Sequence, residues 1–207
     1  NPNSRLVTFN GSSGQTITGT TIFDYLTLNN SAGLTLQTSS AITVNQTLGL
    51  ASGKIIIGAN NLTIGSSGTI TGYNSSNYIV TASSGKLIKQ GVGNTATVFP
   101  VGFSNSNYTP ITLTNTTGTS DLSVSVKQSV SNAVSDATKI VTLEWGIASS
   151  AATTATISPT WVYASPVNQA TSFTNTGTGE LGNFTSIYTT YPVTLSTTTT
   201  TATGVAL

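Results

Sequence analysis

Five carboxylates are the candidates for acid–base catalysis in this sequence, which contains no histidine and no cysteine. They are Asp24, Asp121, Asp136, Glu144 and Glu180. A glycosidase needs two carboxylates that face each other across a cleft, and folding could bring Glu144 and Glu180 together. Acids scattered along a chain are more commonly solvated or cap turns. The sequence therefore predicts a protein that is not an enzyme and uses no cofactor.

The same residue types predict no strong metal site. Catalytic and structural zinc is held mainly by Cys and His, which the chain lacks. Calcium prefers clustered carboxylates, and the sequence has no Asp-x-Asp run. A weak cation site made of Asn side chains and backbone carbonyls stays open.

Aromatic side chains late in the chain offer a second kind of chemistry. Trp145, Trp161, Tyr163, Tyr188 and Tyr191 could form a platform on which sugar rings stack. The alternative is that these rings pack in a hydrophobic core. Trp145 and Trp161 alternate with other apolar residues, which favours the core for at least one of them.

Charged side chains make up only 5% of the residues, against roughly 25% in an ordinary soluble domain. The net charge of +1 provides no basic face for a nucleic acid. No apolar stretch approaches the roughly 20 residues of a membrane-spanning helix. Because low charge weakens the repulsion between copies of a protein, we expect a chain that associates with itself, with neither nucleic-acid binding nor membrane insertion.

Short apolar–Thr–apolar triplets repeat along the first half of the chain. Those at residues 26–28, 34–36 and 42–44 start eight residues apart, and residues 62–64 continue the series. Thr is β-branched and favours strands. A three-residue strand buries its two aliphatic side chains only when copies stack, which is the logic of a β-solenoid. We expect a solenoid over about residues 16–90, with Asn and Gly in left-handed conformations at its corners.

The pattern of short triplets ends over residues 91–110, where two prolines and several glycines mark a junction. The segments after it are longer and alternate, for example DLSVSVKQ and KIVTLEWGI, with turn-rich stretches between them. Alternating strands at such spacing indicate a β-sandwich. We therefore predict an all-β protein with two domains. A β-solenoid domain with an N-terminal strand spans residues 1–92, and a β-sandwich domain spans residues 93–207.

Residues 20–115 also carry a resemblance to a known family. The stretch FDYLTLNNSAGLTLQTSSAITVNQTLGLASGKIIIGANNLTIGSSGTITG, followed by YIVTASSGKLIKQ, FPVG and YTPITLTN, resembles a module of large secreted surface proteins of Bacteroidota. In that family a short solenoid precedes a β-sandwich, often within adhesin-like proteins exported by the type IX secretion route. The resemblance implies a role outside the cell or on its surface, in adhesion.

The start and the composition of the chain agree with secretion. The sequence begins with Asn1 and contains no methionine, which we interpret as a mature chain after removal of a signal peptide. It also holds several Asn-x-Ser/Thr sequons. We expect a glycoprotein whose N- or O-linked sugars, at unknown positions, supply solubility.

Strand-like runs at the two ends of the chain could pair with other subunits. The candidate assembly residues are Arg5, Leu6, Val7, Thr8 and Phe9 at one end, and Val205 and Leu207 at the other. A solenoid presents unpaired backbone at its open end, which a neighbour's donor strand can fill. Head-to-tail contacts of this kind give fibres. The sequence thus predicts a structural homopolymer, a subunit of an extracellular filament or surface layer, unless both tails pair within their own chain.

Two other functions stay open. A cell-surface adhesin or carbohydrate-binding module would use the aromatic platform to bind surface glycans. An ice-binding protein would present rows of outward Thr, usually as Thr-x-Thr. Only TITGT at residues 16–20 and TITG at residues 69–72 fit that pattern.

Overall fold

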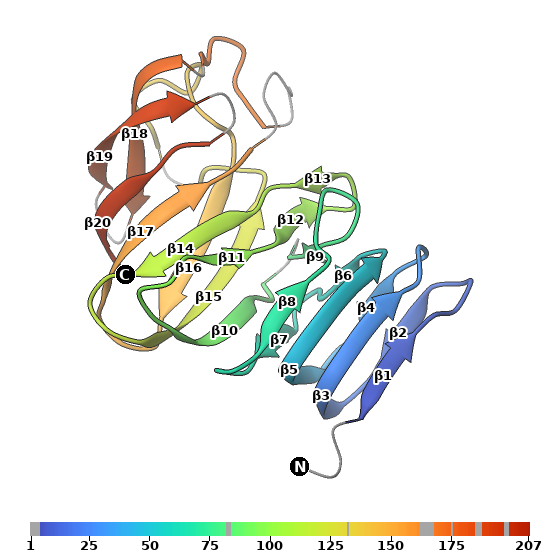
Figure 1. Ribbon diagram of the computed structural model, residues 1–207. Helices are drawn as coiled ribbons and strands as arrows, with labels where there is room; N and C mark the ends of the chain where they lie inside the picture. The colour runs from blue at the N-terminus through green and yellow to red at the C-terminus, as the bar shows by residue number, and fades with distance from the viewer. Residues whose placement is uncertain are drawn as a thin grey trace.

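The computed structural model of the chain describes residues 5–81, 84–131, 133–161, 168–174, 176–184, 188–196 and 199–207. Over these residues the protein is all-β, as predicted, and contains no helix. Figure 1 shows two parts side by side: a stack of short strands that begins near the N-terminus, and a group of longer strands that carries the C-terminus.

The strands of the first part follow one another closely along the chain. They are β1 (Leu6–Phe9), β2 (Gln15–Ile17), β3 (Thr20–Asn29), β4 (Leu34–Leu36), β5 (Ala41–Ser52), β6 (Ile55–Ile56), β7 (Asn61–Ile64), β8 (Thr69–Thr71), β9 (Ile79–Val80) and β10 (Leu87–Val92). The later strands are β11 (Thr97–Phe99), β12 (Val101–Ser104), β13 (Asn107–Tyr108), β14 (Ile111–Asn115), β15 (Ser120–Lys127), β16 (Glu144–Ser149), β17 (Thr154–Pro159), β18 (Thr176–Phe184), β19 (Tyr188–Ser196) and β20 (Ala202–Ala206).

The first part is a β-solenoid, as the repeats predict, and it has about five turns. Each turn has three sides, and strands of successive turns pair in parallel on each side. The first side stacks β1, the second halves of β3 and β5, and β8. The second side stacks the first halves of β3 and β5 with β7 and β10. The third side stacks β2, β4, β6, β9 and β12.

The three triplets that start eight residues apart are the three sides of one turn. Residues 26–28 lie on the first side, residues 34–36 on the third and residues 42–44 on the second. Each triplet stacks on a strand about one turn later, as Ile42 does on Leu62. The short period in the sequence therefore measures the length of one side, and three sides make the structural repeat.

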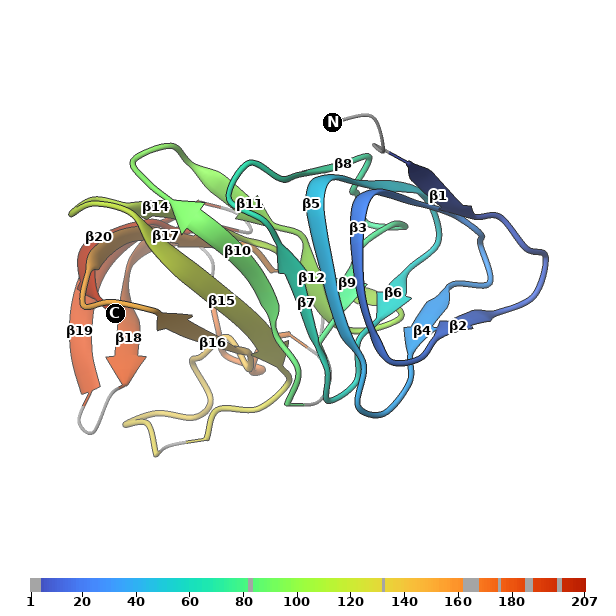
Figure 2. The ribbon, with the colours of Figure 1, turned by 90° about the horizontal axis from the view of Figure 1, so that it is seen from below.

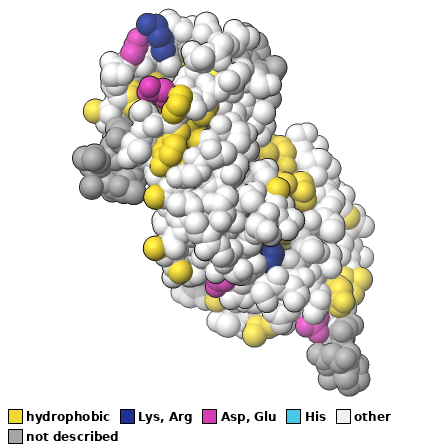
Figure 3. All heavy atoms as spheres, turned by 60° about the vertical axis from the view of Figure 1, so that its left-hand side comes forward, with side chains coloured by type: hydrophobic (Ala, Val, Ile, Leu, Met, Phe, Trp, Pro, Cys, Tyr) yellow, Lys and Arg dark blue, Asp and Glu magenta, His cyan; other side chains and the backbone are white. Residues whose placement is uncertain are grey.

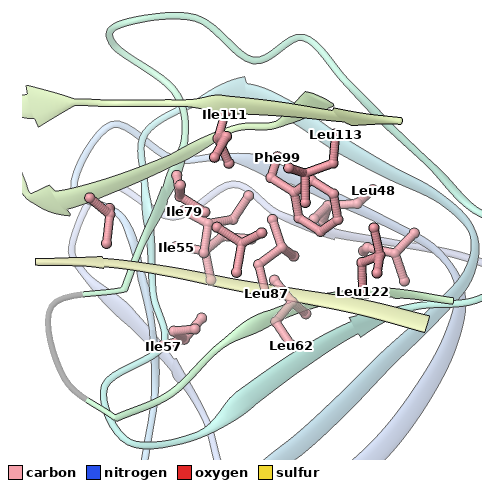
Figure 4. Packing of buried hydrophobic residues seen from close by; sticks show 14 of the residues in the cluster. Leu48, Ile55, Ile57, Leu62, Ile79, Leu87, Phe99, Ile111, Leu113 and Leu122 are labelled. Carbon is pink, nitrogen blue, oxygen red and sulfur yellow. The ribbon is translucent and has the colours of Figure 1, made fainter. Parts of the chain in front are cut away.

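Aliphatic side chains fill the inside of the coil in columns that run along the solenoid. On the second side, Ile42 pairs with Leu62 and Leu62 with Leu87; on the third, Ile55 pairs with Ile79. All five side chains are buried, and Figure 4 shows Ile55, Leu62, Ile79 and Leu87 gathered in one interior. Burying an aliphatic side chain of this size contributes about 1.5–3 kcal/mol, so these columns dominate the stability of the solenoid.

Glycine and asparagine both occupy corners, but of these two residue types only glycine takes the left-handed backbone in the described part of the chain. Gly53 has φ of 90°, and a Cβ there would lie 1.9 Å from the carbonyl oxygen of Asn30. The prediction that Asn shares this conformation is wrong for the described residues, since Ser39 is their only non-glycine residue with positive φ. A left-handed backbone costs any side chain with a Cβ some strain, and the asparagines serve the corners in another way.

Buried asparagine side chains tie each turn to the turn before it. Asn30 Nδ2 donates to the carbonyl oxygen of Ser13 at 2.7 Å. Asn60 Nδ2 donates to the carbonyl oxygen of Leu36 at 3.1 Å, and Asn60 Oδ1 accepts from the backbone N–H of Ser40 at 2.9 Å. Buried polar groups need such partners. The asparagine amides thus form hydrogen bonds with backbone N–H and C=O groups at the corners that the strands leave unpaired.

The sheet on the second side of the solenoid continues into the second part. β15 adds antiparallel to β10, and β16 adds antiparallel to β15. A separate antiparallel sheet has the order β11-β14-β17-β20, and β18 and β19 form a hairpin. Buried side chains of both parts belong to one hydrophobic cluster. The predicted boundary between residues 92 and 93 falls at the end of β10, and the division into two domains stays a prediction.

Two tyrosines pack where the third side of the solenoid meets β13. Tyr78 is fully buried, and its hydroxyl donates to the carbonyl oxygen of Ser104 at 2.7 Å. Its ring centroid lies 5.2 Å from that of Tyr108, and the ammonium of Lys54 lies 5.2 Å from the Tyr78 ring. Burial raises the pKa of both tyrosines to about 12.

We expect the protein to lose stability as the pH rises from about 10 towards 12. An unfolded tyrosine has a pKa of 10.0, while Tyr78 and Tyr108 in the folded chain have a pKa of about 12. The unfolded state therefore loses protons that the folded state keeps, and the loss approaches about 1.4 kcal/mol per pH unit for one fully buried tyrosine. Urea denaturation between about pH 9 and pH 12 measures it. A Tyr78→Phe, Tyr108→Phe variant should decline less steeply, and an equal decline would contradict the assignment.

Candidate functional site

The N-terminal end of the solenoid is open. β1 is the edge strand of the eight-stranded sheet and β2 is the edge strand of the six-stranded sheet. Residues 20–23 of β3 pair only with β5, because β1 pairs with residues 25–28. Figure 1 shows this end at the far side of the solenoid from the second part. Edge strands present unpaired backbone N–H and C=O groups, so this end can accept further strands.

Large apolar side chains are exposed at the same end. Among the described residues, those exposed are Leu6 (61%), Val7 (37%) and Ile22 (67%). Leu6 and Val7 belong to β1, and Ile22 belongs to the first half of β3. In Figure 3, apolar side chains are exposed at the lower end of the molecule. Single exposed aliphatics are common in proteins, but here they coincide with an unpaired sheet edge.

The structure separates the predicted assembly residues into two groups. Arg5, Leu6, Val7 and Thr8 are exposed at the open end, and Phe9 is partly buried against the core. Val205 is fully buried in β20, which pairs with β17 of the same chain, and Leu207 is partly buried next to it. Figure 1 places the two chain ends in different parts of the molecule. The C-terminal strand is therefore already paired within its own chain along one edge.

The second part holds a cavity of about 900 Å³. It lies beside β16, β17, β18 and β20, and the segment 133–141 lines it as well. Trp161 lines the cavity and is 3% exposed, while Tyr191 is half-buried against the core. Tyr163 and the side chain of Tyr188 lie outside the described residues. Trp145 also lines the cavity.

Glu144 and Glu180 line this same cavity. Glu144 forms an ion pair with Lys127 at 3.0 Å and accepts a hydrogen bond from the Ser131 backbone N–H at 2.8 Å. Burial alone would raise the pKa of Glu144, but the Ser131 and Lys127 donors outweigh it and lower the pKa. Asp136 is paired with Lys139 at 3.0 Å. The sequence could name these acids, but only the fold places both glutamates along one cavity.

Lys89 is a half-buried cation that the sequence did not single out. Its position pairs with Ile64, in line with the aliphatic column. Its ammonium donates to the carbonyl oxygens of Gly65 (2.9 Å), Ser66 (2.9 Å) and Gln90 (2.6 Å), and burial lowers its pKa. The cation closes a corner where three backbone carbonyls converge, so we assign it a structural role.

Outward threonines on the first side do not form complete rows. One row runs Thr8, Thr27, Gly49, Thr71, and the neighbouring row runs Leu6, Tyr25, Thr47, Thr69. Leu6, Tyr25 and Gly49 interrupt the lattice that an ice-binding face would need. Residues 69–71 form a Thr-x-Thr strand on the first side. The other Thr-x-Thr stretch, residues 16–18, lies on the third side, where Ile17 is buried.

In the part of the chain that the structure describes, no group of three or more His, Cys, Asp or Glu side chains could hold a metal ion. No helix among these residues could cross a membrane. No family model matches the chain, and neither the curated proteins nor the solved structures contain a match.

Proposed function

We propose that the protein is a structural, non-enzymatic subunit of an extracellular filament or surface layer, assembled through the open end of its solenoid. The observation that carries the proposal is the coincidence of the unpaired edge of β1 with the exposed side chains of Leu6, Val7 and Ile22. Soluble proteins usually protect sheet edges with charges, prolines or bulges. The β1 strand, LVTF, has neither a charge nor a proline.

A strand from another subunit would extend the solenoid in two ways. Its backbone would pair with the free edge of β1, as in other cases of strand addition. Its side chains would continue the interior columns, because Val7 stacks on Leu26 and Phe9 stacks on Leu28 and, among the described residues, no further strand stacks on β1. The low charge of the chain leaves little electrostatic repulsion to oppose the contact.

The opposite edge of the same sheet supplies a partner for head-to-tail growth. The eight-stranded sheet begins at β1 and ends at β16. Placing β16 of one copy beside β1 of the next would carry one sheet through successive subunits. Such a heterologous contact does not close on itself and yields a filament. Pairing of β1 with β1 of a second copy would instead give a closed dimer.

We also propose that residues 93–207 form a β-sandwich that covers the far end of the solenoid. The support is the alternation of buried and half-buried residues along β14, β15 and β17, which is typical of strands with one face against a core. Leu113 of β14 and Val124 of β15 belong to the same hydrophobic cluster. Capping by this unit would leave a single adhesive solenoid end per subunit.

A charge at the open end tests the assembly. Val7→Lys places an ammonium at the end of an interior column, where the free monomer lets it reach water but a docked strand would bury it. We expect this variant to stay monomeric by light scattering and to form no filaments by electron microscopy, with an unchanged far-ultraviolet circular dichroism spectrum. Deleting residues 1–9, the notional donor or acceptor strand, should act in the same direction.

Ser67→Lys is the matched control, because it adds the same charge in an exposed turn away from the open end. This variant should assemble like the unmodified chain. Normal filaments from Val7→Lys would refute the assembly proposal. A concentrated unmodified protein that stays monomeric, or stops at a dimer, would count against it equally.

A further inference from the structure

We infer that the cavity of the second part is a binding site for a neutral sugar, such as the end of a glycan. Its volume of about 900 Å³ lies within the roughly 300–1,000 Å³ of small-molecule sites. The site is remote from the open solenoid end, so this inference stands apart from the assembly proposal.

Aromatic side chains give the cavity flat apolar walls. Trp161 and Phe173 both line it and meet edge to face, with ring centroids 6.2 Å apart and an interplanar angle of 80°. Trp145 also lines it, and its indole N–H donates to the carbonyl oxygen of Thr109 at 3.0 Å, which fixes the ring. Rigid aromatic rings of this kind suit the C–H face of a sugar.

Two polar groups of residues that line the cavity have no partner among the described residues. The indole N–H of Trp161 is buried and has no hydrogen-bond partner among the described residues. The carboxylate of Glu180 lines the cavity, and the structure gives it no ion pair within the described ranges. A buried donor without a partner is costly, at about 1–3 kcal/mol, and such groups call for an explanation. A ligand hydroxyl could accept from Trp161 while another donates to Glu180.

The other acids of the cavity are already occupied. Glu144 is held by Lys127 and the Ser131 backbone, and Asp136 by Lys139. The cavity thus offers Glu180 as its one carboxylate without a described partner. A fully apolar ligand would leave both Glu180 and the Trp161 N–H without partners, whereas a sugar carries an apolar ring face together with hydroxyls. The chemistry of the wall therefore favours a sugar over a lipid chain.

Tryptophan fluorescence reports on this cavity directly, because both tryptophans of the chain line it. The unmodified protein would be titrated with methyl glycosides of glucose, galactose, mannose and N-acetylglucosamine, and with cyclohexanol as a ring of similar size that has one hydroxyl. We expect a saturable fluorescence change with at least one glycoside and weaker binding of cyclohexanol. An oligosaccharide ending in the same sugar should bind at least as well if the natural ligand is a glycan end.

Two variants test the polar contacts. Glu180→Gln, at an exposed position that should not affect folding, should weaken binding of that glycoside about tenfold or more, since it removes a charged hydrogen-bond acceptor. Trp161→Phe keeps an aromatic ring, removes the N–H and should weaken binding similarly, with thermal unfolding as its folding control. Asp24→Asn removes a charge in the solenoid and should leave the affinity unchanged.

Three results would overturn the inference. The first is the absence of any saturable signal with all four glycosides. The second is cyclohexanol binding as tightly as the best glycoside, which would indicate an apolar site. The third is unchanged affinity in Glu180→Gln, which would place the sugar elsewhere.

Discussion

Replacing Leu62 by Ala should lower the free energy of unfolding by about 4 kcal/mol, within the range of about 2–5 kcal/mol for buried Leu→Ala changes. Leu62 lies in the interior between Ile42 and Leu87 and is fully buried. Stacked turns leave its neighbours little freedom to collapse into the space, because each is held by its own strand pairing. Since whole domains are stable by only about 5–15 kcal/mol, urea denaturation should show a large fall in the midpoint.

Thr63→Ala is the matched control in the same strand. Thr63 is the next residue, points to the outer face and is half-buried, so its loss should cost less than about 1 kcal/mol. Equal losses for the two variants would mean that the interior and exterior of β7 are not distinguished, and the three-sided coil would be wrong. The slope of the free energy of unfolding against urea concentration should be the same for both variants, which would show that both unfold from the same compact state.

Replacing Asn60 by Ala should lower the free energy of unfolding by about 2–3 kcal/mol. The Asn60 amide donates to the carbonyl oxygens of Leu36 (3.1 Å) and Ile57 (2.9 Å) and accepts from the Ser40 N–H (2.9 Å). Removal leaves buried backbone groups with fewer partners, and each orphaned group costs about 1–3 kcal/mol. The Ser40 N–H keeps a second acceptor, the Gln37 carbonyl at 3.2 Å, which limits the loss. Thermal and urea unfolding both measure it.

Asn29→Ala provides the comparison for this prediction. Asn29 is exposed at the end of β3, so the same chemical change should alter the free energy of unfolding by less than about 0.5 kcal/mol. If Asn60→Ala proved equally mild, the corner asparagines would not join successive turns, and their frequency in the sequence would need another cause.

The strands of the solenoid could be predicted from residue order because they depend on local alternation. Residues 34–36 and 42–44 form strands with the outer two residues buried and the central Thr half-buried. The shape of the coil could not be predicted in this way. A spacing of eight residues fits a two-sided or a three-sided coil equally well, and only pairing between turns, such as Ile42 with Leu62, separates them.

The candidate sites depended on long-range packing to different extents. Leu6 and Val7 could be named as assembly residues because they precede the first repeat, and the structure exposes them at the open end. Val205 could not be assigned from sequence, since an alternating terminal run fits a donor strand or an internal one, and it pairs within its own chain. The cavity joins Glu180, Trp145 and Trp161 from three separate segments, a grouping that no spacing contains.

The sequence alone determined the all-β class, the solenoid and the shortage of catalytic groups, because strand propensity, alternation and residue type are local or compositional properties. The tertiary structure decided which strands stack, which end of the solenoid lies open and which aromatic and acidic side chains share a cavity. Those features depend on residues far apart in the chain. Asparagine illustrates the difference: its residue type suggested a backbone conformation, and its position between turns made it a hydrogen-bonding link.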